Sequence, residues 1–447
     1  MTTPTPPQSV DLLLSAAWLI PVVPSGAAYE NCACVIRDGR ILAVLPRTEA
    51  ERRYQARETL HLPDHLLMPG LVNAHGHAAM TLLRGLADDM PLQQWLEGHI
   101  WPAESRWLST DFVADGTHLA IAEMIASGTT CFADNYFFPE AVAEAARHSG
   151  IRAQIAFPIL EFATPWAATA EESLHKGLAL YDDLQGHPLV RAAFGPHAPY
   201  TVSDDTFARI AIYAGEVDTA IHIHLHETAR EVADSLAIHG ERPIARLYRH
   251  GLLGPSTQCV HLTQLVDSDI ELLATTGARV VHCPRSNLKL ASGYCDVVGL
   301  RAAGITVGLG SDGAASSNDL DLFTELRFAA LLAKGFGGDA TRLPAAQAIE
   351  MATLGGATAL GLEQEVGSLE PGKAADLIAV ELTDPGALPL YNPLSQLVYT
   401  GRGGHVSHVW VQGRPLLRER QFLTLDIAAV AARARHWQAR IAATSTA

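Results

Sequence analysis

An apolar run leads directly into a His-Gly-His sequence in the stretch Leu67-Met68-Pro69-Gly70-Leu71-Val72-Asn73-Ala74-His75-Gly76-His77. Side chains alternate along a β-strand with period two, so a strand here points His75 and His77 in the same direction. Two histidines that point the same way are suited to bind one metal ion. Histidines at a strand end that only hydrogen-bond their neighbours are the alternative, and the rest of the chain decides between the two.

Apolar runs typical of strands recur along the chain, and stretches typical of helices lie between them. Strands are expected at residues 66–77, 129–136, 152–160, 190–199, 220–227, 257–262, 279–284 and 306–312. Helices are expected at residues 109–127, 139–149, 168–184, 203–217, 229–249, 266–276, 297–303, 319–334 and 345–359. This alternation predicts an α/β fold, a (β/α)8 TIM-type barrel.

Short β segments dominate both ends of the chain. Residues 33–36 and 41–44 are apolar and flank Asp38-Gly39, a typical hairpin turn, and residues 374–380 and 409–414 have the same texture. Because chain termini often lie close together, the two ends are expected to form one small β-sandwich domain. The expected division is a small β domain of residues 10–66 plus 368–420, a metal-dependent barrel of residues 67–367 and a helical tail of residues 421–447.

The composition predicts an acidic protein with a large core. Hydrophobic residues make up 48% of the 447 residues and charged residues 18%. The net charge of −16 argues against nucleic acid, because phosphate binding needs clustered Lys and Arg, and it disfavours an anionic membrane surface. No apolar stretch approaches the ~20 residues that span a bilayer. A small molecule is the expected partner, and a homo-oligomer stays open.

Cysteine usage and the start of the chain indicate the compartment. The six cysteines lack Cys-x-x-Cys pairing and mostly lie in apolar runs, so buried reduced thiols are expected rather than disulfides or a zinc knuckle. Residues 1–9 are rich in Thr and Pro and lack the positive flank and apolar core of a signal peptide. The cytoplasm is the expected location.

Ionisable residues gather where the expected strands end, which is the edge at which a TIM barrel carries its chemistry. They are His75 and His77 on the first strand, His197 on the fourth, His222, His224, His226 and Glu227 on the fifth, His261 on the sixth, His282 on the seventh and Asp312 on the eighth. A random scatter of histidines would not concentrate at strand ends. The concentration therefore favours a metal site.

Zinc prefers nitrogen and carboxylate ligands, and a catalytic site keeps one position open. We expect the ligands His75, His77, Asp312 and one histidine of the fifth strand, but His222, His224 and His226 share a face by parity and spacing does not choose among them.

Glu227 directly follows these histidines and suits a proton shuttle, with a salt bridge to Arg230 as the alternative. His261 interrupts an apolar run, and a hydrogen-bonded core histidine is its alternative.

The motifs resemble those of the amidohydrolase superfamily, and specifically its branch of 5′-methylthioadenosine/S-adenosylhomocysteine deaminases. The likeness extends from about Val10 to Gly413. It is carried by Pro69-Gly70-Leu71-Val72-Asn73-Ala74-His75-Gly76-His77, Thr81-Leu82-Leu83-Arg84-Gly85-Leu86-Ala87-Asp88-Asp89, Gly195-Pro196-His197-Ala198-Pro199-Tyr200, His222-Ile223-His224-Leu225-His226-Glu227-Thr228, His282-Cys283-Pro284, Ser286-Asn287-Leu288-Lys289-Leu290 and Gly310-Ser311-Asp312-Gly313-Ala314-Ala315-Ser316.

The resemblance implies one zinc ion per subunit, held by His75, His77, His224 and Asp312. It selects His224 because the ligand of this family stands three residues before its catalytic glutamate, here Glu227. His261 matches the histidine that polarises the attacking water. The implied reaction replaces the 6-amino group of 5′-methylthioadenosine, S-adenosylhomocysteine or adenosine by oxygen and releases ammonia, with Glu227 protonating ring N1 and Asp312 accepting a proton.

The resemblance also implies the substrate contacts. Trp95 and Glu104 match positions that line the nucleoside pocket, Glu104 facing the ribose hydroxyls, and His197 matches a position that contacts substrate. The best-known members carry arginines after the third strand that bind the homocysteine carboxylate, whereas residues 161–166 contain none. Arg285 is a candidate substitute.

Three alternatives stand beside this interpretation. Related deaminases or chlorohydrolases that act on guanine or triazines share much of the pattern. A cyclic-amide hydrolase with two metals needs a lysine at the end of the fourth strand, where this chain has Phe194-Gly195-Pro196-His197. A binding protein on an inactive barrel would be expected to have lost ligands, and none is lost.

Overall fold

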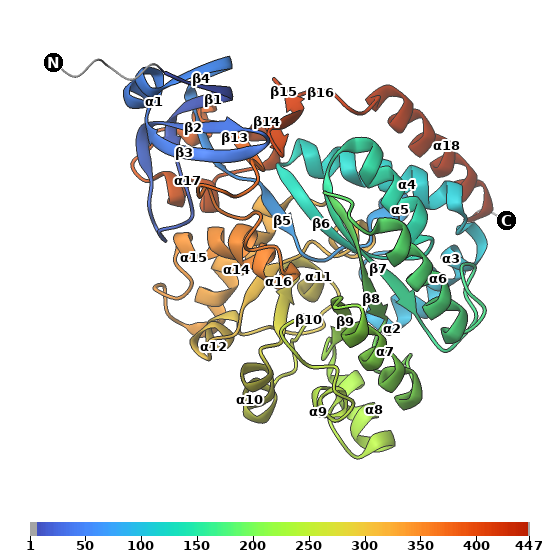
Figure 1. Ribbon diagram of the computed structural model, residues 1–447. Coiled ribbons are helices and arrows are strands. Elements are labelled where there is room, and N and C mark those ends of the chain that lie inside the picture. Colours follow the sequence, from blue (N-terminus) through green and yellow to red (C-terminus); the bar gives the residue numbers. More distant parts are fainter. Residues whose placement is uncertain (1–6, 446–447) are drawn as a thin grey trace.

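The computed structural model describes residues 7–445 and contains two eight-stranded sheets. All strand pairs of the first sheet are parallel, and its strands follow chain order. They are β5 (Leu71–Asn73), β6 (Thr129–Asn135), β7 (Arg152–Ile159), β8 (Val190–Pro196), β9 (Ile221–Leu225), β10 (Thr257–His261), β11 (Arg279–His282) and β12 (Val307–Leu309). Figure 1 shows helices surrounding these strands.

The first and last of these strands meet at their carboxyl ends, which closes the sheet into a barrel. The Ala74 amide donates to the Leu309 carbonyl at 2.8 Å, and the Asp312 amide donates to the His75 carbonyl at 3.1 Å. The Asn73 side chain joins the same seam, because its Oδ1 accepts from the Ser311 amide at 2.9 Å. The predicted (β/α)8 barrel is thereby confirmed.

The helices of the barrel begin where capping residues predict. Side-chain oxygens of Ser109, Thr169, Ser203 and Thr228 accept the amide three residues further on. These caps open α4 (Thr110–Ala126), α6 (Ala170–Leu184), α7 (Asp204–Glu216) and α8 (Ala229–His239). Further helices of this part are α5 (Pro139–Ser149), α9 (Pro243–Arg249), α10 (Asp267–Thr276), α11 (Pro284–Lys289), α12 (Val297–Ala302), α13 (Ala314–Ser317), α14 (Leu322–Gly337), α15 (Ala345–Glu350) and α16 (Gly356–Leu360).

Two predicted elements are each divided by a glycine. The helix expected at 229–249 is two helices, because Gly240 ends α8 with φ 73° and Pro243 starts α9. The strand expected at 66–77 ends at Pro69 as β4 (Tyr54–Pro69), and β5 starts after Gly70. A Cβ at Gly70 would lie 2.0 Å from Thr130 Oγ1, so only glycine lets the chain pass from one sheet to the other here.

The second sheet is built from both chain ends, as predicted, and lies at the upper left in Figure 1. Its order is β16-β15-β14-β13-β4-β1-β2-β3. The strands besides β4 are β1 (Gln8–Leu19), β2 (Tyr29–Arg37), β3 (Arg40–Pro46), β13 (Leu377–Glu381), β14 (Val406–Val411), β15 (Arg414–Arg418) and β16 (Gln421–Phe422). Asp38 and Gly39 form the predicted hairpin turn, with φ 53° and 72°. The boundaries given for the domains stay a prediction.

Several helices were not predicted, because their sequences lack a clear apolar period. A helical segment precedes α4 and consists of α2 (Leu92–Trp95), the π-helix Leu96–Ile100 and α3 (Trp101–Trp107). The predicted C-terminal tail contains α18 (Ile427–Ser445), and residues 446–447 lie outside the described part. Figure 1 shows α18 beside α4, and Trp437 Nε1 donates to Asp115 at 2.9 Å.

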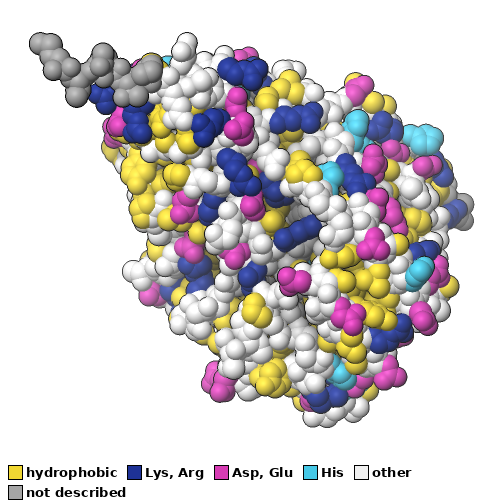
Figure 2. Space-filling model, in the orientation of Figure 1, with side chains coloured by type: hydrophobic (Ala, Val, Ile, Leu, Met, Phe, Trp, Pro, Cys, Tyr) yellow, Lys and Arg dark blue, Asp and Glu magenta, His cyan; other side chains and the backbone are white. Residues whose placement is uncertain are grey.

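The structure also bears on membrane spans, on the cysteines and on the surface charge. Within residues 7–445, no helix combines the length and apolar character needed to cross a membrane. All six cysteines are buried and free. Figure 2 shows acidic and basic side chains interspersed on one face of the molecule, without a broad basic patch there. The signal-peptide expectation concerns residues 1–9, of which 1–6 lie outside the described part.

A buried ion pair joins the two sheets. Arg152 in β7 binds both carboxylate oxygens of Asp376, just before β13, at 2.9 and 3.2 Å. The two side chains are only 4% and 1% exposed. A pair so removed from water leaves an uncompensated charge when one partner is lost.

We expect Arg152→Met to lower the free energy of unfolding by about 3–5 kcal/mol, because Asp376 would keep a buried charge without its partner. Arg40→Met is the matched control, since the Arg40–Glu365 pair also joins the two parts but is about half exposed on both sides and should cost about 1 kcal/mol or less. Urea denaturation measures both. Equal losses in the two variants would contradict a special role for the buried pair.

Candidate active site

The predicted metal ligands converge at the carboxyl ends of the barrel strands. His75 and His77 follow β5, and their Nε2 atoms lie 3.4 and 3.3 Å from Asp312 Oδ1, which follows β12. Possible ligand atoms of His75, His77 and Asp312 all lie within 4.8 Å of one another, and the same holds for His75, His224 and His261. The two groups share His75.

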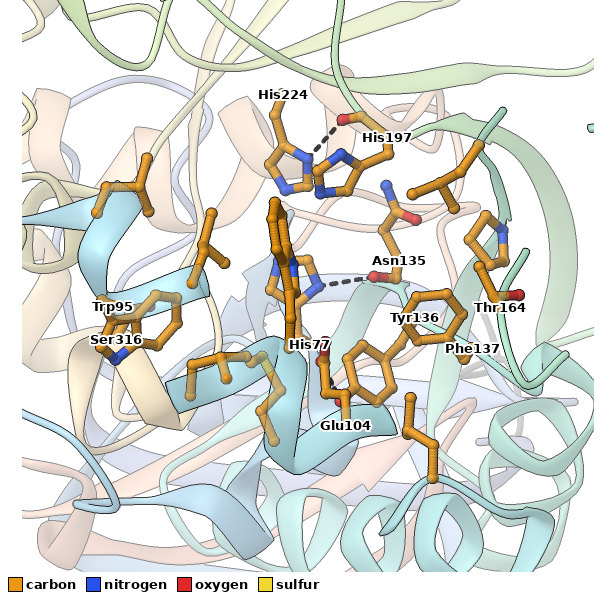
Figure 3. A pocket seen from close by; sticks show the side chains of 18 of the residues that line it. His77, Trp95, Glu104, Asn135, Tyr136, Phe137, Thr164, His197, His224 and Ser316 are labelled. Atoms are coloured by element: carbon orange, nitrogen blue, oxygen red, sulfur yellow. Dashed lines mark hydrogen bonds between the residues drawn. The ribbon is translucent and has the colours of Figure 1, made fainter. Parts of the chain in front are cut away.

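In three of these rings Nδ1, the nitrogen that is not offered to a metal, makes a hydrogen bond that orients the ring. His77 Nδ1 donates to the Asn135 carbonyl at 2.7 Å, and His224 Nδ1 donates to the His197 carbonyl at 2.6 Å. Figure 3 shows both contacts at the wall of the cavity. Because a carbonyl can only accept, the proton sits on Nδ1, and the lone pair of Nε2 is left for a metal.

His261 is held in the same way by Asn287, whose Oδ1 lies 2.9 Å from Nδ1.

The neutral state of the histidine rings and one buried nitrogen without a hydrogen bond also fit a bound metal. Burial lowers the pKa of His75, His77 and His224, so these rings are neutral at pH 7, the form that binds metal. His75 Nε2 is buried and has no hydrogen-bond partner. A buried polar atom without a partner is costly, and a bound cation would satisfy it. The donor set of histidine nitrogens and one carboxylate is typical of zinc.

Asp312 is held by the turn that follows β12. Its Oδ1 accepts from the Gly313 amide at 2.8 Å, and its Oδ2 accepts from the Ser316 hydroxyl at 2.8 Å and from the Ser286 hydroxyl. Burial alone would raise the pKa of this carboxyl, but the neighbouring rings of His75 and, less strongly, His77 bring its net pKa well below the usual value. Asp312 is therefore a carboxylate.

Glu227 lies in the same cavity, close to His261. Its Oε2 is 3.9 Å from His261 Nε2, and its Oε1 accepts from Ser292 at 3.5 Å. Burial raises the pKa of Glu227, which suits a group that takes up and releases a proton. The alternative salt bridge does not form, because Arg230 pairs with Asp234.

The structure separates His222 and His224 of β9 from His226, which follows the strand, although parity left the three equivalent. His222 Nε2 lies 2.7 Å from His75 Nδ1, beneath the ligand rather than beside the cavity. His226 accepts from the Ile244 amide through Nε2 at 3.1 Å and donates to the Gln264 carbonyl through Nδ1. Only His224 lines the cavity. Its selection by family resemblance therefore agrees with the geometry.

The cavity has a volume of about 290 Å³ and contains the predicted substrate contacts. The lining residues include His77, Trp95, Glu104, Asn135, Tyr136, Phe162, His197, Tyr200, His224, Glu227, His261, Asp312 and Ser316. Figure 3 shows Trp95 and Glu104 on one side of His77 and His197 beside His224. Trp95 is fixed by its Nε1, which donates to the Ala87 carbonyl at 3.1 Å.

Glu104 has a partner that the sequence did not suggest. Tyr136, at the end of β6, donates its hydroxyl to Glu104 Oε1 at 2.6 Å. Burial raises the pKa of Glu104 to about 7, although the Tyr136 bond opposes the rise. The other oxygen of the carboxyl stays free for a ligand hydroxyl.

Among residues 7–445, no lysine or arginine lines this cavity. The suggestion that Arg285 substitutes as a carboxylate-binding cation is wrong. Its Nε binds Glu325 at 2.6 Å and its guanidinium also pairs with Asp319 at 2.7 Å. This buried network commits Arg285 to the packing of α14.

Sequence reasoning missed the residues that orient the ligands. Asn287, Ser286 and Ser316 all lie inside motifs quoted above, yet nothing in their spacing indicates that they face the site. Backbone strain is a further sign that appears only in three dimensions. His226, His261 and Asp312, each at or just beyond the end of its strand, have φ of 51°, 78° and 60°.

Comparison with known proteins adds the family. The model of the amidohydrolase family matches residues 66–416. The chain belongs to the amidohydrolase family. This amidohydrolase is 53% identical over 435 residues to a protein of Teredinibacter turnerae named 5-methylthioadenosine/S-adenosylhomocysteine deaminase, a match covering 97% of this chain and 98% of the relative. A protein of the same name from Saccharophagus degradans is 53% identical over 443 residues, 99% of each chain. The resemblance stated from the motifs is confirmed.

Solved structures of similar proteins have the same fold. The amidohydrolase superposes with a TM-score of 0.97 on the crystal structure of an adenosine deaminase from Xanthomonas campestris with bound zinc, at 47% identity, covering 98% of this chain and 100% of that chain. Atrazine chlorohydrolase from Arthrobacter aurescens, with zinc, gives a TM-score of 0.89 at 24% identity, covering 95% and 99% of the two chains. The second likeness shows the fold alone. A metal cofactor fits both the first likeness and the geometry.

We expect the purified protein to contain a zinc-class metal and His75→Ala to lose it, because His75 belongs to both groups of possible ligands. His408→Ala, which removes an equally buried histidine from β14, should retain the metal. Elemental analysis after dialysis measures both. Full metal content in His75→Ala would contradict the assigned site.

Proposed function

We propose that this amidohydrolase is a metal-dependent hydrolytic deaminase that converts the 6-amino group of 5′-methylthioadenosine or S-adenosylhomocysteine to the 6-oxo purine with release of ammonia. The observation that carries the proposal is the 53% identity, over almost the whole chain, to relatives named for this reaction. A cavity of about 290 Å³ with the ligand set at its base is consistent with a nucleoside substrate.

We infer one zinc ion per chain, held by His75, His77, His224 and Asp312. Zinc supplies a water whose pKa falls to about 7, so that hydroxide is available at neutral pH. The four proposed ligands belong to the two groups of possible metal ligands described above. The six buried free thiols are compatible with the cytoplasm, the location that we propose.

Two side chains transfer protons in the proposed reaction, and a third orients the reacting groups. Glu227 carries a proton to ring N1 as the nucleophile adds at C6, so negative charge does not accumulate on the purine. Asp312, a carboxylate held by Gly313 and two serines, accepts the proton of the attacking water. His261, whose Nδ1 faces Asn287, points Nε2 toward Glu227 and orients the reacting groups. A proton is then returned to the departing amino group, which leaves as ammonia.

Recognition of the nucleoside is assigned to Trp95, Glu104 and His197, all in the cavity wall. Glu104 has one oxygen bound to Tyr136, and its other oxygen would accept a ribose hydroxyl. Trp95 and Phe162 offer an apolar wall to a methylthio group. With no cation among the lining residues, a homocysteine carboxylate would have no partner there.

We expect Glu227→Gln to lower kcat by about 10²-fold or more, because the amide has the size of the acid but cannot carry the proton. Metal content should stay unchanged, since Glu227 is not among the assigned ligands. Steady-state kinetics and elemental analysis on the same preparation measure the two quantities. Near-normal turnover would move the acid–base role to His261 or Asp312.

We expect 5′-methylthioadenosine to match or exceed S-adenosylhomocysteine in kcat/KM, because a methylthio group needs only an apolar wall, whereas the described lining residues include no lysine or arginine for the homocysteine carboxylate. The 2′-deoxy analogue should be much poorer, since a buried carboxyl such as Glu104 would lose its hydroxyl partner. The absorbance change from adenine to hypoxanthine measures all three. A preference for S-adenosylhomocysteine of tenfold or more, about 1.4 kcal/mol, would contradict this assignment.

A further inference from the structure

A column of polar side chains runs through the barrel from His75 toward the opposite end. We propose that Arg191, near the start of β8, sets the tautomer of the metal ligand His75 through four consecutive hydrogen bonds and so readies its Nε2 for the metal. Arg191 is thereby a positioning residue that acts from the end of the barrel remote from the substrate. The proposal rests on the metal centre of the proposed function.

The column is continuous. The Arg191 guanidinium donates to Gln154 Oε1 at 2.9 Å, and Gln154 Nε2 donates to Gln258 Oε1 at 2.6 Å. The same Gln258 oxygen lies 2.7 Å from His222 Nδ1, and His222 Nε2 lies 2.7 Å from His75 Nδ1. These residues come from β7, β8, β9 and β10 and from the segment after β5, so each step crosses between strands.

The direction of every bond follows from the arginine. A guanidinium has only donors, so Gln154 must turn its oxygen toward Arg191 and its amide nitrogen toward Gln258. Gln258 then presents its oxygen, which accepts from His222 Nδ1. His222 Nε2 carries no proton and accepts from His75 Nδ1. His75 Nε2 is left with a lone pair, and this is the buried atom that has no partner.

The same hydrogen bonds could run in the opposite direction, and only the bond to Arg191 would then fail. If both glutamine amides were flipped, Gln258 would donate to His222, and His222 would donate to His75. His75 would then carry its proton on Nε2, which cannot bind a metal in that form. The flip would also turn the Gln154 amide nitrogen toward Arg191, donor against donor. Arg191 therefore excludes the state that cannot bind metal.

Of the nearby arginines, Arg191 is the one that donates to the column, because the other two bind elsewhere. Arg152 is bound to both oxygens of Asp376, and Arg279 donates to the Thr358 carbonyl. No ion pair of Arg191 is found among the described residues, and it lines a cavity of about 470 Å³ at its end of the barrel. Gln154, His222 and Gln258 are at most 1% exposed, so the partners of their side chains are mainly one another.

The test is zinc affinity measured by chelator competition on the folded protein without substrate. Arg191→Met removes the donor that sets the direction, and we expect the zinc dissociation constant to rise about tenfold or more. Arg191→Lys, which restores a donor, should recover part of the affinity. Arg279→Met is the matched control, because it removes an arginine from the same cavity that does not touch the column, and its affinity should stay within about threefold of wild type.

A second pair of variants keeps the test decisive if Arg191→Met does not fold. In Gln258→Glu a carboxyl oxygen still accepts from His222, so affinity should be retained, whereas Gln258→Leu should lose about tenfold. Circular dichroism verifies folding of each variant. Unchanged affinity in Arg191→Met and Gln258→Leu would overturn the positioning role. Failure of the wild-type protein to bind zinc would instead overturn the proposed metal centre, so the two failures are distinct.

Discussion

The closure of the barrel between β12 and β5 is the constraint on which the site depends. The bonds from Ala74 to Leu309 and from Asp312 to His75 join residues more than two hundred positions apart in the chain. They place the carboxylate that follows the last strand within 3.4 Å of both histidines that follow the first. A barrel that failed to close at this seam would have its ligands on two separate edges, so fold and metal centre form together.

Much of this arrangement was predictable because it is local. Strand ends, capped helices and the Asp38-Gly39 hairpin follow from alternation, capping and turn chemistry, each of which acts within a few residues. The prediction that His75 and His77 converge was correct, but the stated reason was not. The strand ends at Asn73, so the turn after it, and not the alternation of a strand, directs the two rings.

The sequence could not predict at which level of the barrel each side chain lies and what it contacts there. Parity predicts one face for His222, His224 and His226, yet β9 ends at Leu225 and the three rings have different surroundings. The lowest supports His75, the middle one faces the cavity and the highest binds the Gln264 and Ile244 backbone. The level depends on how neighbouring strands are staggered, as in the pairing of His224 with Val260, and stagger is a long-range property. The same holds for Tyr136, whose partner Glu104 lies on an unpredicted helix.

Burial is what gives these side chains their chemistry, and it also limits what the site can hold. Removal from water keeps the histidines neutral and raises the pKa of Glu227 and Glu104, which in solution would both be ionised at neutral pH. Such a site tolerates polar groups only where each finds a partner. In the interior column each side chain from Arg191 to His75 is hydrogen-bonded to the next, and His75 Nε2 is left without a hydrogen bond among the described residues. This atom faces the other ligands, so a cation bound there would give it the partner that it lacks.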